Sequence, residues 1–131
     1  MKLVSKNRWI EIYVPIYKMS VIVTWEQDID RIIKTAKKHG VKISNEWKGK
    51  FNKCSEGANG VCMIIGDANT DIIVWLKEKP LKASQFGTLY HELYHAVDNI
   101  AADHNLENER EARAYVFEFL VNKCNKVLWS R

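Results

Sequence analysis

The prevailing spacing of apolar residues changes at Pro80, and that change restricts the folds available to this chain. Before Pro80 the apolar residues gather in short runs rich in Val, Ile and aromatic side chains, which are typical of strands. After Pro80 they recur every three or four residues, which is the spacing of amphipathic helices. The pattern predicts strands at residues 8–16, 20–25, 61–65 and 71–77, and helices at residues 84–100 and 109–128.

One further helix is expected at residues 26–39, because Ile29, Ile32, Ile33 and Ala36 follow helical spacing and Gly40 supplies a stop. Residues 41–60 are polar, contain glycine and carry only isolated aromatics, so we expect a long loop there with at most one short strand. The four strands should form two hairpins, the second closing through a turn at residues 66–70. The expected order is β-β-α-β-β-α-α, an α+β fold with a mostly antiparallel sheet in a single domain, residues 1–131.

Composition excludes several classes of protein. With 47% hydrophobic and 27% charged residues, the chain is expected to be a soluble globular domain, and no stretch reaches the roughly 18 apolar residues that a membrane span needs. Its three cysteines, Cys54, Cys62 and Cys124, show neither a CxxC spacing nor an even count, so we expect a reducing cytoplasm. A net charge of +4 is too small to indicate nucleic-acid binding.

The segment His91-Glu92-Leu93-Tyr94-His95 contains the pattern H-E-x-x-H within a predicted helix. A spacing of four places both imidazoles on one helical face, one turn apart, where two nitrogens reach the same ion. Zinc is the expected metal, because neutral imidazole is a good zinc ligand and zinc accepts a tetrahedral site with one position left to water. Glu92 lies beside that water and is expected to act as general base.

A third protein ligand is expected from the acidic start of the next predicted helix, where a carboxylate would complete the two-histidine, one-glutamate set of zinc peptidases. Helical geometry alone favours Glu109, which lies about 50° from the apolar face, over Glu111, which lies about 110° from it. Either glutamate can equally be a solvated residue placed there by the helix dipole. Asp98, seven residues after His91, is expected either to orient a ligand imidazole or to be solvated.

Two segments, LYHELYHAVD at residues 89–98 and EAxAYxxxxL at residues 111–120, resemble the small gluzincin-type metallopeptidase domains of phages and mobile elements. These domains are distant relatives of the IrrE/ImmA peptidases. In them, zinc is held by the two histidines and by a glutamate that opens a later E-x-x-A segment. The phage-type pattern E-x-x-A-Y matches Glu111, whereas the IrrE-like pattern laid on Glu109 has Arg113 where Asn is usual and Tyr115 where Phe is usual. The resemblance therefore implies zinc bound by His91, His95 and Glu111 in a zincin-like fold.

The resemblance implies peptide hydrolysis by a zinc-activated water, with a peptide or protein substrate bound as an extended strand. We expect the strand at residues 71–77 to be the sheet edge that receives it. An alternative is a zinc-stabilised binding or regulatory protein without turnover, although a purely structural site needs no general base such as Glu92. A third interpretation, a nucleic-acid surface formed by the basic residues 31–53 with Trp47 and Phe51, leaves the two histidines unexplained.

Overall fold

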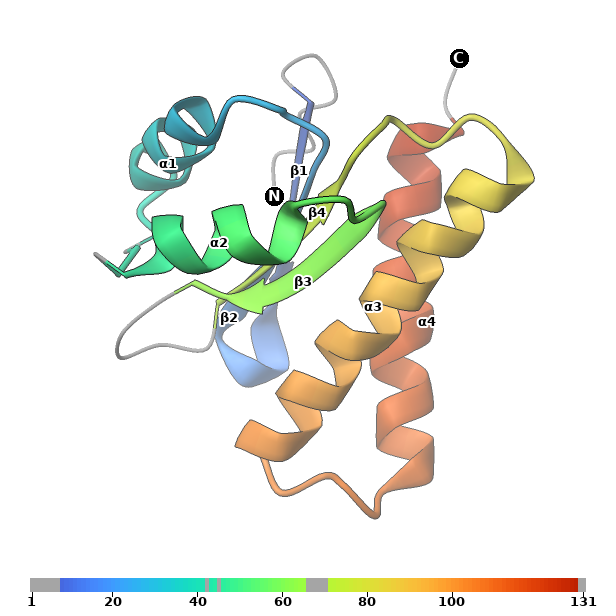
Figure 1. The fold of residues 1–131 in the computed structure, drawn as a ribbon. Helices are drawn as coiled ribbons and strands as arrows, with labels where there is room; N and C mark the ends of the chain where they lie inside the picture. Colours follow the sequence, from blue (N-terminus) through green and yellow to red (C-terminus); the bar gives the residue numbers. More distant parts are fainter. Residues whose placement is uncertain (1–7, 42, 45, 66–70, 130–131) are drawn as a thin grey trace.

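A computed structural model describes residues 8–41, 43–44, 46–65 and 71–129 of the chain (Figure 1). Its elements are, in order, strand β1 (Trp9–Val14), a 3-10 turn η1 (Pro15–Tyr17), strand β2 (Met19–Thr24), helices α1 (Ile29–Lys38) and α2 (Trp47–Ser55), strands β3 (Gly60–Ile64) and β4 (Ile72–Leu76), and helices α3 (Ala83–Asp103) and α4 (Arg110–Leu128).

The four strands form one sheet in the order β1-β2-β4-β3. Strands β1 and β2 pair antiparallel, as do β3 and β4, so both predicted hairpin pairings are confirmed; the turn predicted at residues 66–70 lies outside the described residues. Strands β2 and β4 pair parallel, which makes the sheet mixed. The α+β class is therefore confirmed, and two of the three strand pairings are antiparallel.

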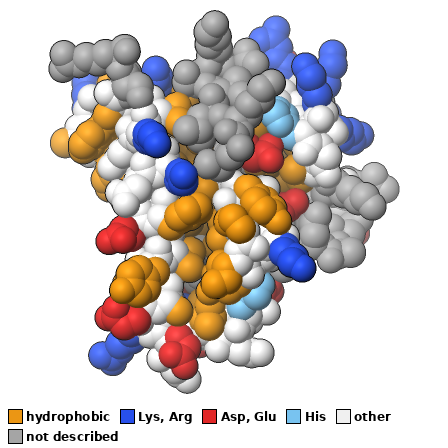
Figure 2. Space-filling view, turned by 180° about the vertical axis from the view of Figure 1, so that it is seen from behind, with side chains coloured by type: hydrophobic (Ala, Val, Ile, Leu, Met, Phe, Trp, Pro, Cys, Tyr) orange, Lys and Arg blue, Asp and Glu red, His pale blue; other side chains and the backbone are white. Residues whose placement is uncertain are grey.

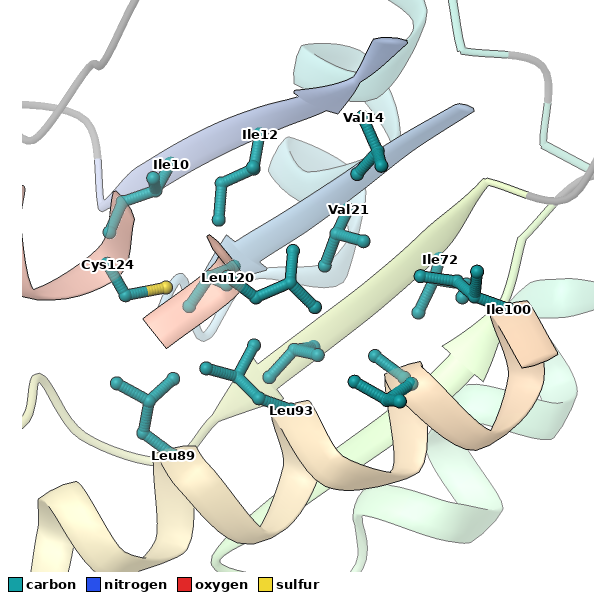
Figure 3. Close-up of a cluster of buried hydrophobic side chains, with 14 of the residues drawn as sticks. Ile10, Ile12, Val14, Val21, Ile72, Leu89, Leu93, Ile100, Leu120 and Cys124 are labelled. Carbon is teal, nitrogen blue, oxygen red and sulfur yellow. The ribbon is translucent and has the colours of Figure 1, made fainter. Parts of the chain in front are cut away.

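Helices cover both faces of this sheet, with α1 and α2 on one face and α3 and α4 on the other (Figure 1). Every residue of the central strands β2 and β4 is buried, which explains their nearly continuous β-branched sequences. On the α3 and α4 face, helix residues such as Leu89, Leu93 and Leu120 point toward sheet residues such as Ile12 and Ile72 (Figure 3). This packing holds α3 firmly against the sheet and leaves its outer face to solvent.

Helix α1 begins later than predicted, at Ile29, because Asp28 caps it by accepting a hydrogen bond from the backbone N–H of Asp30. Gly40 follows its last turn with a φ of +83°, a conformation that suits glycine, so the predicted stop is confirmed. Helices α3 and α4 also lie where the apolar spacing predicts them.

The prediction of a long loop over residues 41–60 was wrong, since α2 occupies Trp47–Ser55. Trp47 and Phe51 lie one turn apart and are buried, their rings stack at 5.0 Å, and Phe51 meets the ring of Trp75 edge-on at 5.5 Å. Two large aromatic side chains on one helical face are enough to anchor a short helix to the sheet, although they leave little periodic pattern in the sequence.

The prediction that residues 71–77 form a sheet edge was also wrong. Strand β4 lies between β2 and β3, and β3 is the edge strand. The physical reason is burial: β4 is apolar at every position and is covered on both faces, whereas β3 retains the exposed Ile64 and three partly exposed residues. Any peptide that extends the sheet on this side would therefore pair with β3.

On the back of the molecule, hydrophobic side chains gather at the surface (Figure 2). They line an open apolar groove of about 480 Å³ between η1 and α4, in which Ile16 and Tyr115 are well exposed. None of the helices in the described ranges is long and apolar enough to cross a membrane.

Candidate metal and catalytic site

The two histidines of the H-E-x-x-H segment lie on the exposed face of α3, one turn apart. Their Nε2 atoms are 3.2 Å from each other and their rings meet edge to face. Two nitrogens bound to one tetrahedral zinc ion, each about 2.0–2.1 Å from it, lie about 3.3–3.4 Å apart. The structure thus brings His91 and His95 together in a spacing that suits a shared metal ion.

Glu92 projects from the same turn of α3 but toward the sheet, and it is 8% exposed. Its side chain lies against the first residue of β3, since a Cβ built on Gly60 would be 2.9 Å from Cγ and 3.2 Å from Oε2 of Glu92. Burial raises the pKa of Glu92, and the neighbouring His91 and His95 oppose that shift. A carboxylate of higher pKa is a better proton acceptor.

Cys62 lies two residues further along β3, on the same face of the strand as Gly60. Asn99 of α3 donates a hydrogen bond to its sulfur at 3.8 Å. Burial, together with the negative charge of Glu92, raises the pKa of Cys62 to about 12, so the thiol stays protonated and is not prepared to act as a nucleophile.

The side of α3 that faces α4 carries an ion pair between Asp98 and Arg113. Interactions with Asp98 and, to a smaller extent, with Tyr94 raise the pKa of the Arg113 guanidinium. The ring of Tyr94 meets that of Phe117 edge-on at 6.2 Å. Asp98 is therefore paired with Arg113 rather than simply solvated, and the contact ties the turn after His95 to the first half of α4.

Glu111 lies in the first turn of α4 and Glu109 at the position that precedes the helix, and both are exposed. Within the described part of the chain, no three His, Cys, Asp or Glu side chains come close enough together to hold a metal ion. The structure thus joins His91, His95 and Glu92 in one site but does not bring Glu109 or Glu111 to the histidine pair. The third ligand stays a prediction.

The outer edge of β3 runs past this site. The N–H of Lys77 donates to the carbonyl of Asn59, and the N–H of Ile65 donates to the carbonyl of Asp71. The backbone N–H and C=O groups of the odd-numbered residues in this segment therefore point toward β4. Antiparallel strands alternate, so the backbone N–H and C=O groups of Gly60, Cys62 and Ile64 point away from β4. An extended peptide pairing with this edge would pass beside Gly60 and Glu92.

Sequence reasoning missed two residues of the site. Gly60 stands out in the sequence only as a glycine directly before a β-rich run, a position that signals either a turn or a close approach of backbone to a neighbour. Arg113 is a basic residue near the acidic start of a helix, where an ion pair with Asp98 fifteen residues earlier leaves no local pattern. Both roles depend on which elements become neighbours in the fold.

No protein family model, curated protein or solved structure matches this chain.

Proposed function

We propose that this protein is a zinc-dependent metallopeptidase with a zincin-like active site on α3. The observation that carries the proposal is the pair of imidazole nitrogens 3.2 Å apart with the buried Glu92 on the same helical turn. A merely structural zinc site has no use for a buried carboxylate beside its histidines, whereas hydrolysis needs a general base next to the reacting water.

The two imidazoles that α3 brings together are suitable zinc ligands. Both imidazoles are exposed, so the ion and a substrate can reach them from solvent. We propose His91, His95 and Glu111 as the ligands; the first two are brought together by α3, and Glu111 is proposed from the E-x-x-A-Y resemblance alone. When bound, zinc would polarise the scissile carbonyl and lower the pKa of a water molecule.

Glu92 would accept a proton from the attacking water and then donate it to the amine that leaves, so that one residue serves first as base and then as acid. Its position between α3 and β3 suits this role, because the carboxylate lies beside the strand edge along which an extended peptide would run. Backbone groups of β3 would hold the substrate by main-chain hydrogen bonds, which demand little of its sequence.

The three cysteines are free, which suits a reducing compartment such as the cytoplasm. A role in a phage or other mobile element is proposed on the resemblance alone. The proposed partner is a peptide or protein substrate.

The test separates an enzyme from a zinc-stabilised binding protein. Glu92→Gln keeps the size of the side chain and leaves both histidines in place, so zinc content and melting temperature should stay close to those of the parent protein. Cleavage of an unfolded protein such as labelled casein, or of a peptide mixture, should fall by at least about 100-fold. Equal cleavage by parent and variant would exclude Glu92 as the base; zinc binding with no cleavage by either protein would favour the binding role.

A further inference from the structure

Gly60, the first residue of β3, lies directly against the Glu92 side chain of α3. A Cβ at this position would lie 2.9 Å from Cγ of Glu92, a distance that real Cβ atoms hardly ever show, and 3.0 Å from Cγ2 of Thr88, which is tighter than most real Cβ contacts. Four other described glycines, Gly40, Gly49, Gly57 and Gly87, have no atom within 4 Å of the same constructed position. Among these five glycines, Gly60 alone lies where a side chain would collide with its neighbours.

We propose that Gly60 is a positioning residue for Glu92: the missing side chain at position 60 provides the space in which the carboxylate is held beside the edge of β3. This inference rests on the proposed role of Glu92 as general base. On this proposal, the position of the Glu92 carboxylate is set by β3 as well as by α3, the helix that carries Glu92.

Neither backbone is free to retreat from a larger residue at position 60. On one side, α3 is held to the sheet by Leu89, Leu93 and Ala96, all of them fully buried. On the other side, β3 is held to β4 along its whole length, and Asn59 accepts a hydrogen bond from Lys77 at 2.9 Å. A methyl group at position 60 would therefore move the flexible Glu92 side chain out of its place before it moved either element.

The first experiment measures stability in a double-mutant cycle and needs neither metal nor substrate. Gly60→Ala should lower the melting temperature of the metal-free protein by about 3–10 °C, since overpacking a tight contact is destabilising. In a Glu92→Ala background most of that loss should disappear, because Cγ and the carboxylate are gone. If Gly60→Ala alone does not fold, a double variant with Glu92→Ala that does fold would support the proposal in the same way.

Thr88→Ser is the matched control, because it removes the other atom that a Cβ would meet, Cγ2 of Thr88. If Thr88→Ser relieves the loss and Glu92→Ala does not, the spacing is set by Thr88 and the proposal is wrong. An equal loss in all backgrounds would contradict it as well. Gly87→Ala, which adds a methyl group to α3 in open space, should not lower the melting temperature.

The second experiment reports on the position of the carboxylate. Acetohydroxamate chelates zinc and can also donate a hydrogen bond to a carboxylate beside the metal. Its affinity for the zinc-loaded protein should therefore depend on where the Glu92 carboxylate lies. Gly60→Ala should weaken acetohydroxamate binding about tenfold and leave zinc affinity within about twofold of the parent value, and Glu92→Gln should behave in the same way.

The two proposals fail differently. Acetohydroxamate affinity unchanged by Gly60→Ala would overturn the positioning role, even with zinc bound by His91 and His95. Absence of zinc binding by the parent protein would overturn the proposed function, while the stability cycle would still decide whether Gly60 and Glu92 share one space.

Discussion

At the scale of single residues, the candidate site combines two exposed imidazoles with a buried carboxyl group. His91 and His95 face solvent, whereas Glu92, between them in sequence, turns inward to Gly60. Helical geometry produces this division, because the residue after His91 is rotated by about 100° around the axis. One turn of helix thereby presents the proposed ligands outward and the proposed base toward β3.

The cysteines provide a prediction at the same scale. Burial raises the pKa of both Cys62 and Cys124 to about 12, whereas Cys54 is exposed. At pH 8 only about one in ten thousand thiols with that pKa is ionised, so neither the partly buried Cys62 nor the buried Cys124 should react readily. Iodoacetamide should modify the folded protein once, at Cys54, as mass spectrometry of tryptic peptides would show. Rapid modification of a Cys54→Ser variant would contradict the burial of the other two.

At the scale of elements, the start of α4 carries both candidates for the third ligand. We predict that Glu111→Ala lowers zinc affinity by orders of magnitude, because two imidazoles and water must then hold the ion. Glu109→Ala should remove only a helix-dipole interaction of about 0.3–1 kcal/mol. Titration of zinc against a competing chelator compares the two variants.

A large loss at Glu109 with little change at Glu111 would reverse that assignment. If neither variant loses affinity, Asp98 is the next residue to test, and Asp98→Asn is the suitable change because it keeps the shape of the partner of Arg113.

Helix α2 gives a second prediction at this scale. Phe51 is 4% exposed and contacts both Trp47 and Trp75, so Phe51→Ala should reduce the free energy of unfolding by about 3–5 kcal/mol. Asn52→Ala, at an exposed position of the same helix, should change it by no more than about 0.5 kcal/mol. Urea unfolding measures both. Similar effects of the two changes would mean that α2 is not anchored through its aromatic side chains.

At the scale of the whole molecule, features set by residues close together in the sequence could be predicted, whereas features set by residues far apart could not. Local spacing was sufficient for the strand pairs and for three of the four helices, because residues such as Ile32 and Ala36 repeat at the period of the element that they form. It was insufficient for the order of the strands, since the parallel pairing of Val21 with Ile72 joins residues far apart in the chain. The edge position of β3 and the meeting of Gly60 with Glu92 both depend on that order.

The candidate site likewise has one part that the local sequence predicts and one part that it does not. His91, Glu92 and His95 lie within five residues, so a helix is enough to predict their grouping, and the structure confirms that the histidine nitrogens meet. A ligand from α4 depends instead on how two helices pack across a turn, and the contacts Asp98–Arg113 and Tyr94–Phe117 were not visible in the sequence. Zinc, the identity of the third ligand and peptide cleavage remain predictions.

The measurement that tests the central claim most directly is the metal content of the protein purified without added zinc, determined by mass spectrometry of the metal. We predict one zinc ion per chain in the parent protein, and less than about a tenth of that in His91→Ala and His95→Ala, because one imidazole and one carboxylate hold the ion far more weakly than the full set of ligands. Both variants should also melt at a lower temperature than the zinc-bound parent. A parent protein that binds no zinc even when zinc is supplied, or a His91→Ala variant that keeps a full equivalent, would contradict the claim.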